Sequence, residues 1–342
     1  MSNEHLQNLI EQADAFGRNG GDVGDHTRDE VLKQDLIREI IYANAGAMSV
    51  GTELIPTRQM TSKSIQFEYP GSTTAEYPVA PDTLADRQRF TWKEFKMRLQ
   101  RAQTRYFISD DAKLSGMADI QAQRAASEAS RALAMRKDEN ILGTLLGGAY
   151  DENESDASGH WNTPGTGGID EDELIDDLWA MWEEILVNTP LETAETGTLA
   201  VVLPVRVYTQ LNRLKLINNI QQRTEDYLSQ TFNFQFYPTK LHMHEDNQLE
   251  EQYDVSTEDT ALMVMTGENT AVHGELSEQF ASSVGVPLTE GPNREFGLGE
   301  DYLITQWYNT GIMEHETGKE GETPRIAVRH GVNYHADPEF HN

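Results

Sequence analysis

The chain has 342 residues, of which 57 are Asp or Glu and 27 are Lys or Arg, so its formal net charge at pH 7 is −30. This length accommodates about two domains with buried cores. The absence of cysteine excludes disulfides and thiolate chemistry. No apolar run reaches the roughly 20 residues that span a bilayer. The N-terminal segment, with Glu4 and Glu11, lacks the apolar core of a secretory signal. We therefore expect a protein made in the cytoplasm without membrane contact.

The acidic balance indicates adaptation to concentrated salt. A net charge of −30 repels itself in dilute buffer, and concentrated salt screens that repulsion over a few ångströms. Arginine also clearly outnumbers lysine. The alternative is an acidic protein from an ordinary environment. A disordered chain is excluded, because aliphatic and aromatic residues recur in patterned segments.

The first third of the chain predicts two helical segments followed by a long two-stranded excursion. The helical segments lie within residues 1–45 and end near Gly46. Residues 65–69 alternate with period two, and residues 90–99 place Phe95, Met97 and Leu99 on one face. The opposite face carries Trp92, Glu94, Lys96 and Arg98. Most of this excursion is too polar to form a core, and an isolated hairpin is marginally stable, so we expect it to lie on another surface.

A long helix is predicted over residues 113–147. Ser109 is a capping residue, and Asp110 and Asp111 stand at the positive end of the helix dipole. The segment contains no proline, and Gly147 and Gly148 end it. A helix of about thirty residues is about 45 Å long.

The second half predicts a mixed α/β domain, because strands and helices alternate. A surface loop over 150–168 precedes a helix over 170–187. Residues 199–203 form an apolar strand, and Pro204 begins a further helix. The remaining strands are expected at 232–236, 261–265, 302–308, 311–315 and 326–329.

The order of these parts resembles the major capsid proteins of tailed double-stranded DNA viruses, which have the Hong Kong 97-type fold. The resemblance covers residues 46–332 and depends on five segments in sequence. They are FISDDA at 107–112, ALAMRKDENILG at 132–143, LPVRVYTQL at 203–211, GIME at 311–314 and PRIAV at 324–328. With the acidic composition, it suggests a haloarchaeal tailed virus.

The resemblance implies an α+β fold with an N-terminal arm at 1–45 and an extended β-hairpin loop at 58–108. It implies a peripheral domain at 46–57, 109–168 and 300–342, which contains the long spine helix, and an α/β axial domain at 169–299. It implies a non-enzymatic shell subunit of the virion that forms pentamers and hexamers without a cofactor. The shell encloses double-stranded DNA without sequence-specific binding, and its partners are portal, scaffolding and decoration proteins. Too little precedes Gly46 for a fused scaffolding segment, and nothing singles out residues for the covalent cross-link of some relatives.

Cationic and aromatic residues gather on the excursion, in an otherwise acidic chain. The candidates for contact with a neighbouring subunit are Arg87, Arg89, Phe90, Trp92, Lys93, Lys96 and Arg98. Arg101 and Arg105 continue this strip. Two alternatives stand beside the intersubunit interpretation. The cations can pair with carboxylates of their own subunit, or they can meet packaged DNA, whose binding concentrated salt weakens.

Two other functions fit parts of the sequence. An encapsulin-like nanocompartment has the same fold but a different role. A halophilic metal-dependent enzyme would use His242 and His244, which share one face if they lie on a strand. We expect no metal site there, because no third ligand is identifiable.

Overall fold

The computed structural model describes residues 49–70, 92–111, 118–154, 161, 171–189, 199–213, 234–239, 259–267, 270–286, 288–293, 299–313 and 322–333. The chain divides into two compact units. Unit 1 comprises Met1–Ser49, Arg101–Arg136 and Glu278–Trp307. Unit 2 comprises Val50–Gln100, Lys137–Ser277 and Tyr308–Asn342.

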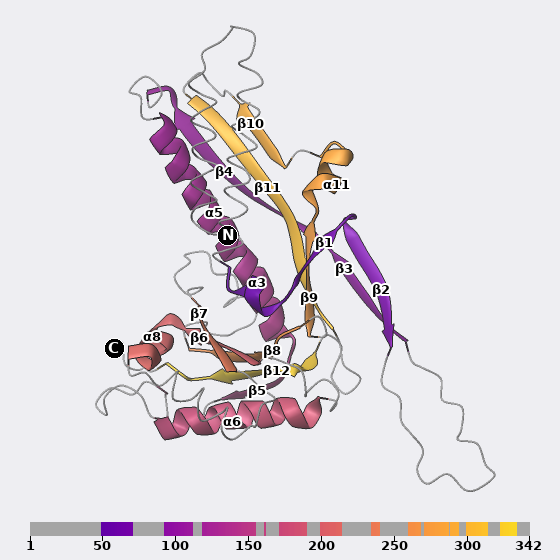
Figure 1. Cartoon of the computed structure of the whole chain (residues 1–342), viewed down its shortest axis with the longest axis vertical. Helices are drawn as coiled ribbons and strands as arrows, with labels where there is room; N and C mark the ends of the chain where they lie inside the picture. The colour runs from indigo at the N-terminus through magenta and orange to yellow at the C-terminus, as the bar shows by residue number, and fades with distance from the viewer. Residues whose placement is uncertain are drawn as a thin grey trace, which may run out of the picture. The chain divides into compact units, whose positions relative to one another are not determined.

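Unit 2 contains a five-stranded mixed sheet, called the β6 sheet, with the order β5-β12-β8-β6-β7 (Figure 1). Its strands are β5 (Ala149–Glu154), β12 (Thr323–His330), β8 (Ala261–Met265), β6 (Leu199–Pro204) and β7 (Phe234–Thr239). The β6 strand pairs parallel with β7 and antiparallel with β8. Every residue of β6 and β8 is buried. Their uninterrupted apolar sequences are typical of strands covered on both faces.

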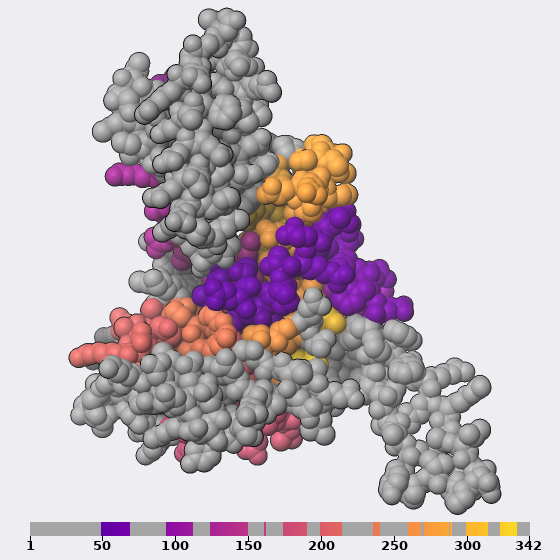
Figure 2. Space-filling view, viewed as in Figure 1, coloured from indigo at the N-terminus to yellow at the C-terminus, as the bar shows by residue number. Residues whose placement is uncertain are grey.

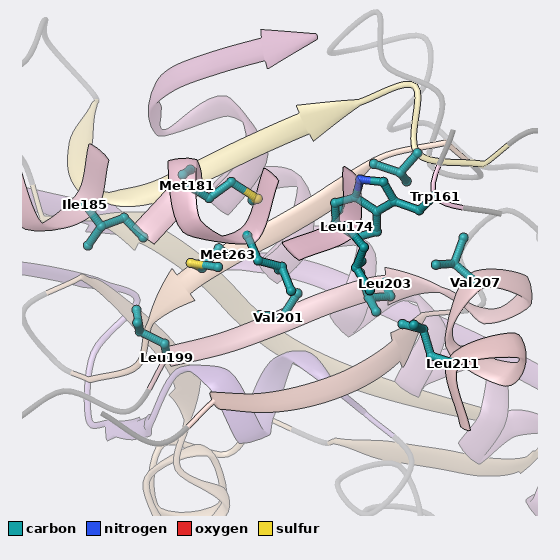
Figure 3. Close-up of a cluster of buried hydrophobic side chains, with 14 of the residues drawn as sticks. Trp161, Leu174, Met181, Ile185, Leu199, Val201, Leu203, Val207, Leu211 and Met263 are labelled. Carbon is teal, nitrogen blue, oxygen red and sulfur yellow. The ribbon is translucent and has the colours of Figure 1, made fainter. Parts of the chain in front are cut away.

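Helices cover the two faces of the β6 sheet. Alternate residues of β6, beginning with Leu199, belong to one apolar cluster together with residues of α6 (Glu171–Asn188) and α8 (Val205–Arg213) (Figure 3). Ala200 and Val202 belong to a second cluster, with α3 (Gly51–Leu54) and the last turns of α5 (Ala118–Gly147). The period-two alternation of strand side chains thus divides one strand between two cores.

Gly51 allows α3 to approach α5 closely. The backbone N–H groups of Val50 and Gly51 donate to the Asp138 carboxylate at 3.2 and 2.8 Å. A Cβ on Gly51 would lie 2.8 Å from Cβ of Ile141. Since Cβ of Ile141 is fixed by the helix backbone, no larger residue fits at position 51 without a backbone shift.

A second five-stranded sheet, called the β11 sheet, contains β1 (Thr57–Met60), β9 (Ala271–Leu276), β11 (Gly299–Ile312), β10 (Thr289–Asn293) and β4 (Gln100–Ser109). The β9 strand pairs parallel with β1 and antiparallel with residues 308–312 of β11. In unit 1, β10 pairs antiparallel with residues 301–304 of β11, and α11 (Glu278–Ser283) precedes it.

Unit 1 has its own small core between β4, β11 and α5. Small side chains of α5, including Ala126 and Ala129, pack against Tyr106 and Ile108. The ring of Tyr106 stacks on Tyr302 at 5.0 Å between centroids. Burial raises the pKa of Tyr106 to about 12. On the other side of β4, Arg105 binds Asp301, with its Nη2 2.6 Å from Oδ2.

Most predicted elements of the described residues are confirmed, and three are corrected. The helices over 113–147 and 170–187 correspond to α5 and α6, and the strands at 199–203 and 261–265 to β6 and β8. The predicted loop over 150–168 is wrong at its start, because residues 149–154 form β5 beside β12. The strands at 302–308 and 311–315 are one continuous strand, β11. Pro204 ends β6, so α8 begins one residue later.

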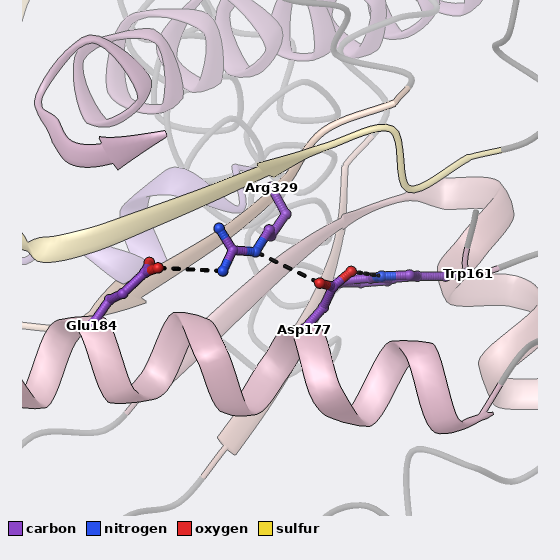
Figure 4. A network of polar contacts seen from close by, with 4 residues as sticks. All are labelled: Trp161, Asp177, Glu184 and Arg329. Carbon is purple, nitrogen blue, oxygen red and sulfur yellow. Dashed lines mark hydrogen bonds and ion pairs between the residues drawn. The ribbon is translucent and has the colours of Figure 1, made fainter. Parts of the chain in front are cut away.

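A buried ion network fastens α6 to the β6 sheet (Figure 4). Arg329 of β12 lies between two carboxylates of α6, with its Nε 3.7 Å from Oδ1 of Asp177 and its Nη2 3.4 Å from Oε1 of Glu184. The indole Nε1–H of Trp161 donates to the other oxygen of Asp177 at 2.7 Å. The guanidinium is buried, whereas both carboxylates retain some contact with solvent.

Replacing Arg329 by Ala should lower the free energy of unfolding of the protein by about 3 kcal/mol, because it leaves two partly buried carboxylates without their cation. Chemical denaturation followed by tryptophan fluorescence measures this change. The matched control is Arg206→Ala, an exposed arginine of the same unit, which should change stability by less than about 0.5 kcal/mol. Equal effects of the two substitutions would contradict the structural role of the network.

Candidate inter-subunit surface

The predicted excursion forms a β-hairpin in unit 2. Strands β2 (Ser64–Pro70) and β3 (Trp92–Arg98) pair antiparallel, with Phe67 opposite Phe95 and Glu68 opposite Glu94. Figure 2 shows this hairpin in indigo and violet at the surface of the molecule. Arg87, Arg89 and Phe90 lie outside the described residues. Trp92 and Lys93 lie in β3, where the structure describes only their backbone.

The two faces of β3 differ as the sequence predicts. Phe95, Met97 and Leu99 are 5%, 6% and 2% exposed. Glu94, Lys96 and Arg98 are exposed on the other face. The strand therefore has one apolar face that needs a cover and one charged face that is open to solvent.

The β11 sheet of the same chain covers this apolar face, and two of its glycines leave the space for the β3 side chains. A Cβ on Gly311 of β11 would lie 2.6 Å from Cζ of Phe95. A Cβ on Gly274 of β9 would lie 2.6 Å from Cε of Met97 and 3.4 Å from Cδ2 of Leu99. The missing side chains of β9 and β11 leave room for β3, so the β11 sheet is the surface on which the base of the hairpin lies. The contact of the excursion with a neighbouring subunit remains a prediction.

Strand β2 completes this base with an aromatic stack. The rings of Phe67 and Phe95 lie 4.9 Å apart and nearly parallel. The guanidinium of Arg58, on β1, lies 5.6 Å from the centroid of the Phe67 ring. The backbone N–H of Leu99 donates to the carbonyl of Lys63 at 2.8 Å. Both strands of the hairpin are thus fixed to the subunit at their base.

A chain of amide hydrogen bonds connects the end of β3 with helix α5. The Nδ2 of Asn309 donates to the carbonyl of Arg98 at 2.9 Å. Its Oδ1 accepts from Nδ2 of Asn140 at 3.0 Å and from the backbone N–H of Thr310 at 2.9 Å. The Asn309 side chain is therefore occupied inside the subunit.

The chain of hydrogen bonds ends at a fully buried histidine. The hydroxyl of Thr310 donates its proton to Oδ1 of Asn140 at 2.8 Å, so it accepts from Nδ1 of His273, 2.9 Å away. Nδ1 of His273 therefore carries a proton. Burial, and then the charge of Lys137, lower the pKa of His273 from 6.5 to about 3. The ammonium of Lys137 pairs with Glu275 at 3.2 Å.

Several cations of the strip have partners in their own subunit. Lys96 lies 2.5 Å from a carboxylate oxygen of Glu94, and Glu94 also accepts from Gln66. The Lys96 side chain is 62% exposed, and exposed pairs of this kind contribute little to stability. The guanidinium of Arg101 lies 5.9 Å from the ring centroid of Trp307. Lys96 therefore pairs with a carboxylate of its own subunit, which is one of the alternatives for the strip. This ion pair is exposed and contributes little to stability.

The described residues contain no group of three or more His, Asp or Glu side chains that could hold a metal ion. His242 and His244 lie outside these residues. His330 is described, and its Nδ1 lies 3.0 Å from the hydroxyl of Thr260. In the same described part of the chain, no helix is long and apolar enough to cross a membrane.

Replacing Phe95 by Ala should lower the free energy of unfolding of the unassembled subunit by about 3 kcal/mol, because it leaves a cavity over Gly311. Lys96→Ala is the matched control on the opposite face of the same strand and should change stability by less than about 1 kcal/mol. Urea denaturation of both variants checks this. A neutral Phe95→Ala would mean that the base of the hairpin is not held by its own subunit.

His273 should make the folded state lose stability as the pH falls. The unfolded chain takes up a proton at His273 near pH 6.5 and the folded chain only near pH 3. The contribution is therefore complete above pH 6.5 and decreases toward pH 3, by up to about 1.4 kcal/mol per pH unit. His273→Asn, which keeps a donor for Thr310, should show a correspondingly shallower pH dependence in denaturation between pH 6.5 and 4. Parallel profiles of the two proteins would contradict a buried neutral His273.

No protein-family model matches the sequence, and no curated protein sequence matches it either. Solved structures do match the fold. The virus-like particle from Pyrococcus furiosus superposes with a TM-score of 0.55 and 11% identity, over 86% of this chain and 98% of that chain. The capsid of cyanophage P-SCSP1u has a TM-score of 0.51 and 13% identity, over 82% of this chain and 87% of that chain.

A structure from Mycobacterium phage Che8 has a TM-score of 0.51 and 12% identity, over 82% of this chain and 90% of that chain. Sequence identities this low establish likeness of fold alone. The chain therefore has the mixed α/β fold of phage capsid and virus-like-particle proteins, as the resemblance to the Hong Kong 97-type family implies.

Proposed function

We propose that this chain is the major capsid protein of a tailed virus, which assembles into a closed icosahedral shell around double-stranded DNA. The observation that carries the proposal is the extent of the shared fold. The match covers 86% of this chain and 98% of the virus-like-particle chain, so it includes both units and not one common motif. Proteins that share a fold can differ in function, and the elements below give the proposal its further support.

The elements suit the parts of a capsid subunit. We assign α5 as the spine helix of a peripheral domain formed by residues 46–57, 109–168 and 300–342. Residues 169–299 are the axial domain, to which α6, α8 and most of the β6 sheet belong. Residues 1–45 are the arm, and residues 58–108 are the extended loop. In this assignment the subunit forms pentamers and hexamers, and its partners are portal, scaffolding and decoration proteins.

The hairpin is proposed to contact a neighbouring subunit beyond its base. Its own subunit already covers Phe95, Met97 and Leu99, so the charged face of β3 remains free for another chain. Lys96 and Arg98 lie on that face. With Arg87, Arg89, Phe90, Trp92 and Lys93, they provide cations and aromatic rings that suit the acidic surface of a second copy.

We further propose that the shell belongs to a virus of a salt-loving archaeon. Subunits with a net charge of −30 repel each other at every interface, and molar salt shortens the range of that repulsion to about 3 Å. Assembly should therefore need concentrated salt.

A nanocompartment shell is the second candidate, and the match to the Pyrococcus furiosus virus-like particle favours it. Both candidates predict closed shells, so assembly alone does not separate them. The identity of the neighbouring genes separates the two candidates. Portal and large terminase genes would support the capsid, and a gene for an enclosed enzyme would support the nanocompartment.

Electron microscopy of the purified protein should show closed icosahedral shells in molar salt. The same sample should lose its shells after dilution, because the repulsion between acidic subunits is no longer screened. Sedimentation velocity of both samples gives the fraction assembled. A small oligomer of constant size in all salt concentrations, with added scaffolding protein or without it, would contradict the proposed function.

A further inference from the structure

Helix α6 carries two apolar stripes, of which the second is only partly buried, with Trp182 packed against the apolar cluster that α6 and α8 share with β6. The first stripe is fully buried and consists of Leu174, Leu178, Met181 and Ile185. The second follows one residue later at helical spacing and consists of Ile175, Trp179, Trp182 and Leu186. Trp179 is 36% exposed, and its ring meets that of Trp182 edge to face at 5.2 Å. Val187, on the outer side of the helix, is 74% exposed.

The second stripe has a strongly acidic border. The α6 sequence contains seven carboxylates and no Lys or Arg. Asp177 and Glu184 face Arg329 on the inner side. Asp176 and Glu183 are exposed and stand seven residues apart, so they lie on one side of the helix next to Trp179. A surface that covers this stripe must therefore supply cations.

Helix α8 carries such a surface on the same unit. Its sequence contains no carboxylate. Arg206 and Arg213 are exposed and stand seven residues apart, with the exposed Thr209 between them. The opposite side of α8 is buried through Val207 and Leu211. The two arginines thus form a short cationic stripe that faces away from the β6 sheet.

The two helices lie toward opposite edges of one sheet face. Both contribute to the apolar cluster drawn in Figure 3. In the strand order β5-β12-β8-β6-β7, α6 packs on β12 and α8 on β6 and β7. One copy therefore presents an acidic and aromatic flank at one edge and a cationic flank at the other. Complementary patches on different sides of one subunit form head-to-tail contacts, which close into rings when the rotation permits.

We propose that α8 of one copy docks on the second stripe of α6 in the next copy, and that this contact joins successive subunits around each pentamer and hexamer. This inference rests on the proposed shell function. Arg206 and Arg213 supply guanidinium groups that stack on Trp179 and pair with Asp176 and Glu183. Such contacts act at short range, so concentrated salt weakens them less than it weakens the long-range repulsion between acidic copies.

Charge reversal on one flank should abolish the contact. The double variant Arg206→Glu, Arg213→Glu places carboxylates of α8 against carboxylates of α6 at every head-to-tail contact. The double variant Asp176→Arg, Glu183→Arg places cations against cations there. Each double variant should reduce the assembled fraction at least tenfold in sedimentation velocity. A chain with all four substitutions should regain shells, because both flanks are reversed together. The matched control is Arg124→Glu, a reversal at an exposed arginine of α5, which should leave the assembled fraction within twofold of the unmodified protein.

A mixture of the two double variants gives a sharper test. Two copies of the same double variant repel each other at the contact, whereas a copy of one variant and a copy of the other meet with opposite charges. The mixture should therefore form rings with strictly alternating variants and an even number of subunits. Mass spectrometry of the capsomers should show hexamers and no pentamers, and the mixture should form no closed icosahedral shell.

Two results would overturn the inference while the proposed function stands: shells from either double variant alone, or no recovery in the fourfold variant. If the unmodified protein forms no shell in any salt concentration, the proposed function fails instead. Thermal unfolding of each unassembled variant is measured in parallel. A double variant that unfolds below the assay temperature is replaced by the corresponding double alanine variant, for which the same loss of assembly is expected and normal assembly overturns the inference.

Discussion

The packing of the β2–β3 hairpin base on its own chain is the contact on which the proposed intersubunit role of the hairpin depends. Strand β3 buries Phe95 and Met97 against β11 and β9, where Gly311 and Gly274 leave the necessary space. A two-stranded hairpin has little stability alone, so without this packing its direction would be undefined. Asn309 adds a hydrogen bond from β11 to the end of β3 and continues through Asn140 to helix α5. The same elements that form the core of unit 2 therefore set the direction in which the hairpin leaves it.

Charge is the second constraint. A subunit with a net charge of −30 can associate with its copies only where cations are concentrated or where apolar surface is buried. Cations gather in helix α5, in the strip from Arg87 to Arg105 and in helix α8. The proposed contacts use two of these places: the strip contacts the subunit beside the hairpin, and α8 contacts the next subunit in the same pentamer or hexamer. In each place aromatic side chains occur nearby, so cations and ring faces can interact at short range in concentrated salt.

The sequence predicts the elements whose signals are local. Helix α5 has a long stretch without proline, and β6 and β8 are continuous apolar runs, so both types were identified correctly. Strand β9 was not identified, because its sequence AVHGEL contains a histidine, a glycine and a glutamate. His273 is buried there with its Nδ1 bonded to the hydroxyl of Thr310, which in turn donates to Asn140, and both residues are distant from His273 in the sequence. Strand β5 has a loop-like sequence, and it is a strand because it pairs with β12.

For the candidate surface too, the sequence predicts the local features and misses those that depend on distant residues. The alternation of residues 94–99 predicted correctly which side chains share a face. It did not reveal that the apolar face belongs to the subunit's own core, because Gly274 and Gly311 are more than 170 residues away in the sequence. The sequence predicts a separate strand that begins at Gly311, whereas in the structure Gly311 lies inside β11 and makes room for Phe95. Glycines that accommodate distant side chains give no local signal of that role.

The central claim is that the hairpin extends from its own subunit onto a neighbour in a closed shell. A cryo-electron microscopy reconstruction of shells assembled in molar salt tests it most directly. The account predicts continuous density for residues 58–108, with Phe95 on Gly311 of the same chain and the residues from Arg87 to Lys93 against an adjacent subunit. A shell in which that segment folds back on its own chain, with neighbours joined elsewhere, would contradict the account.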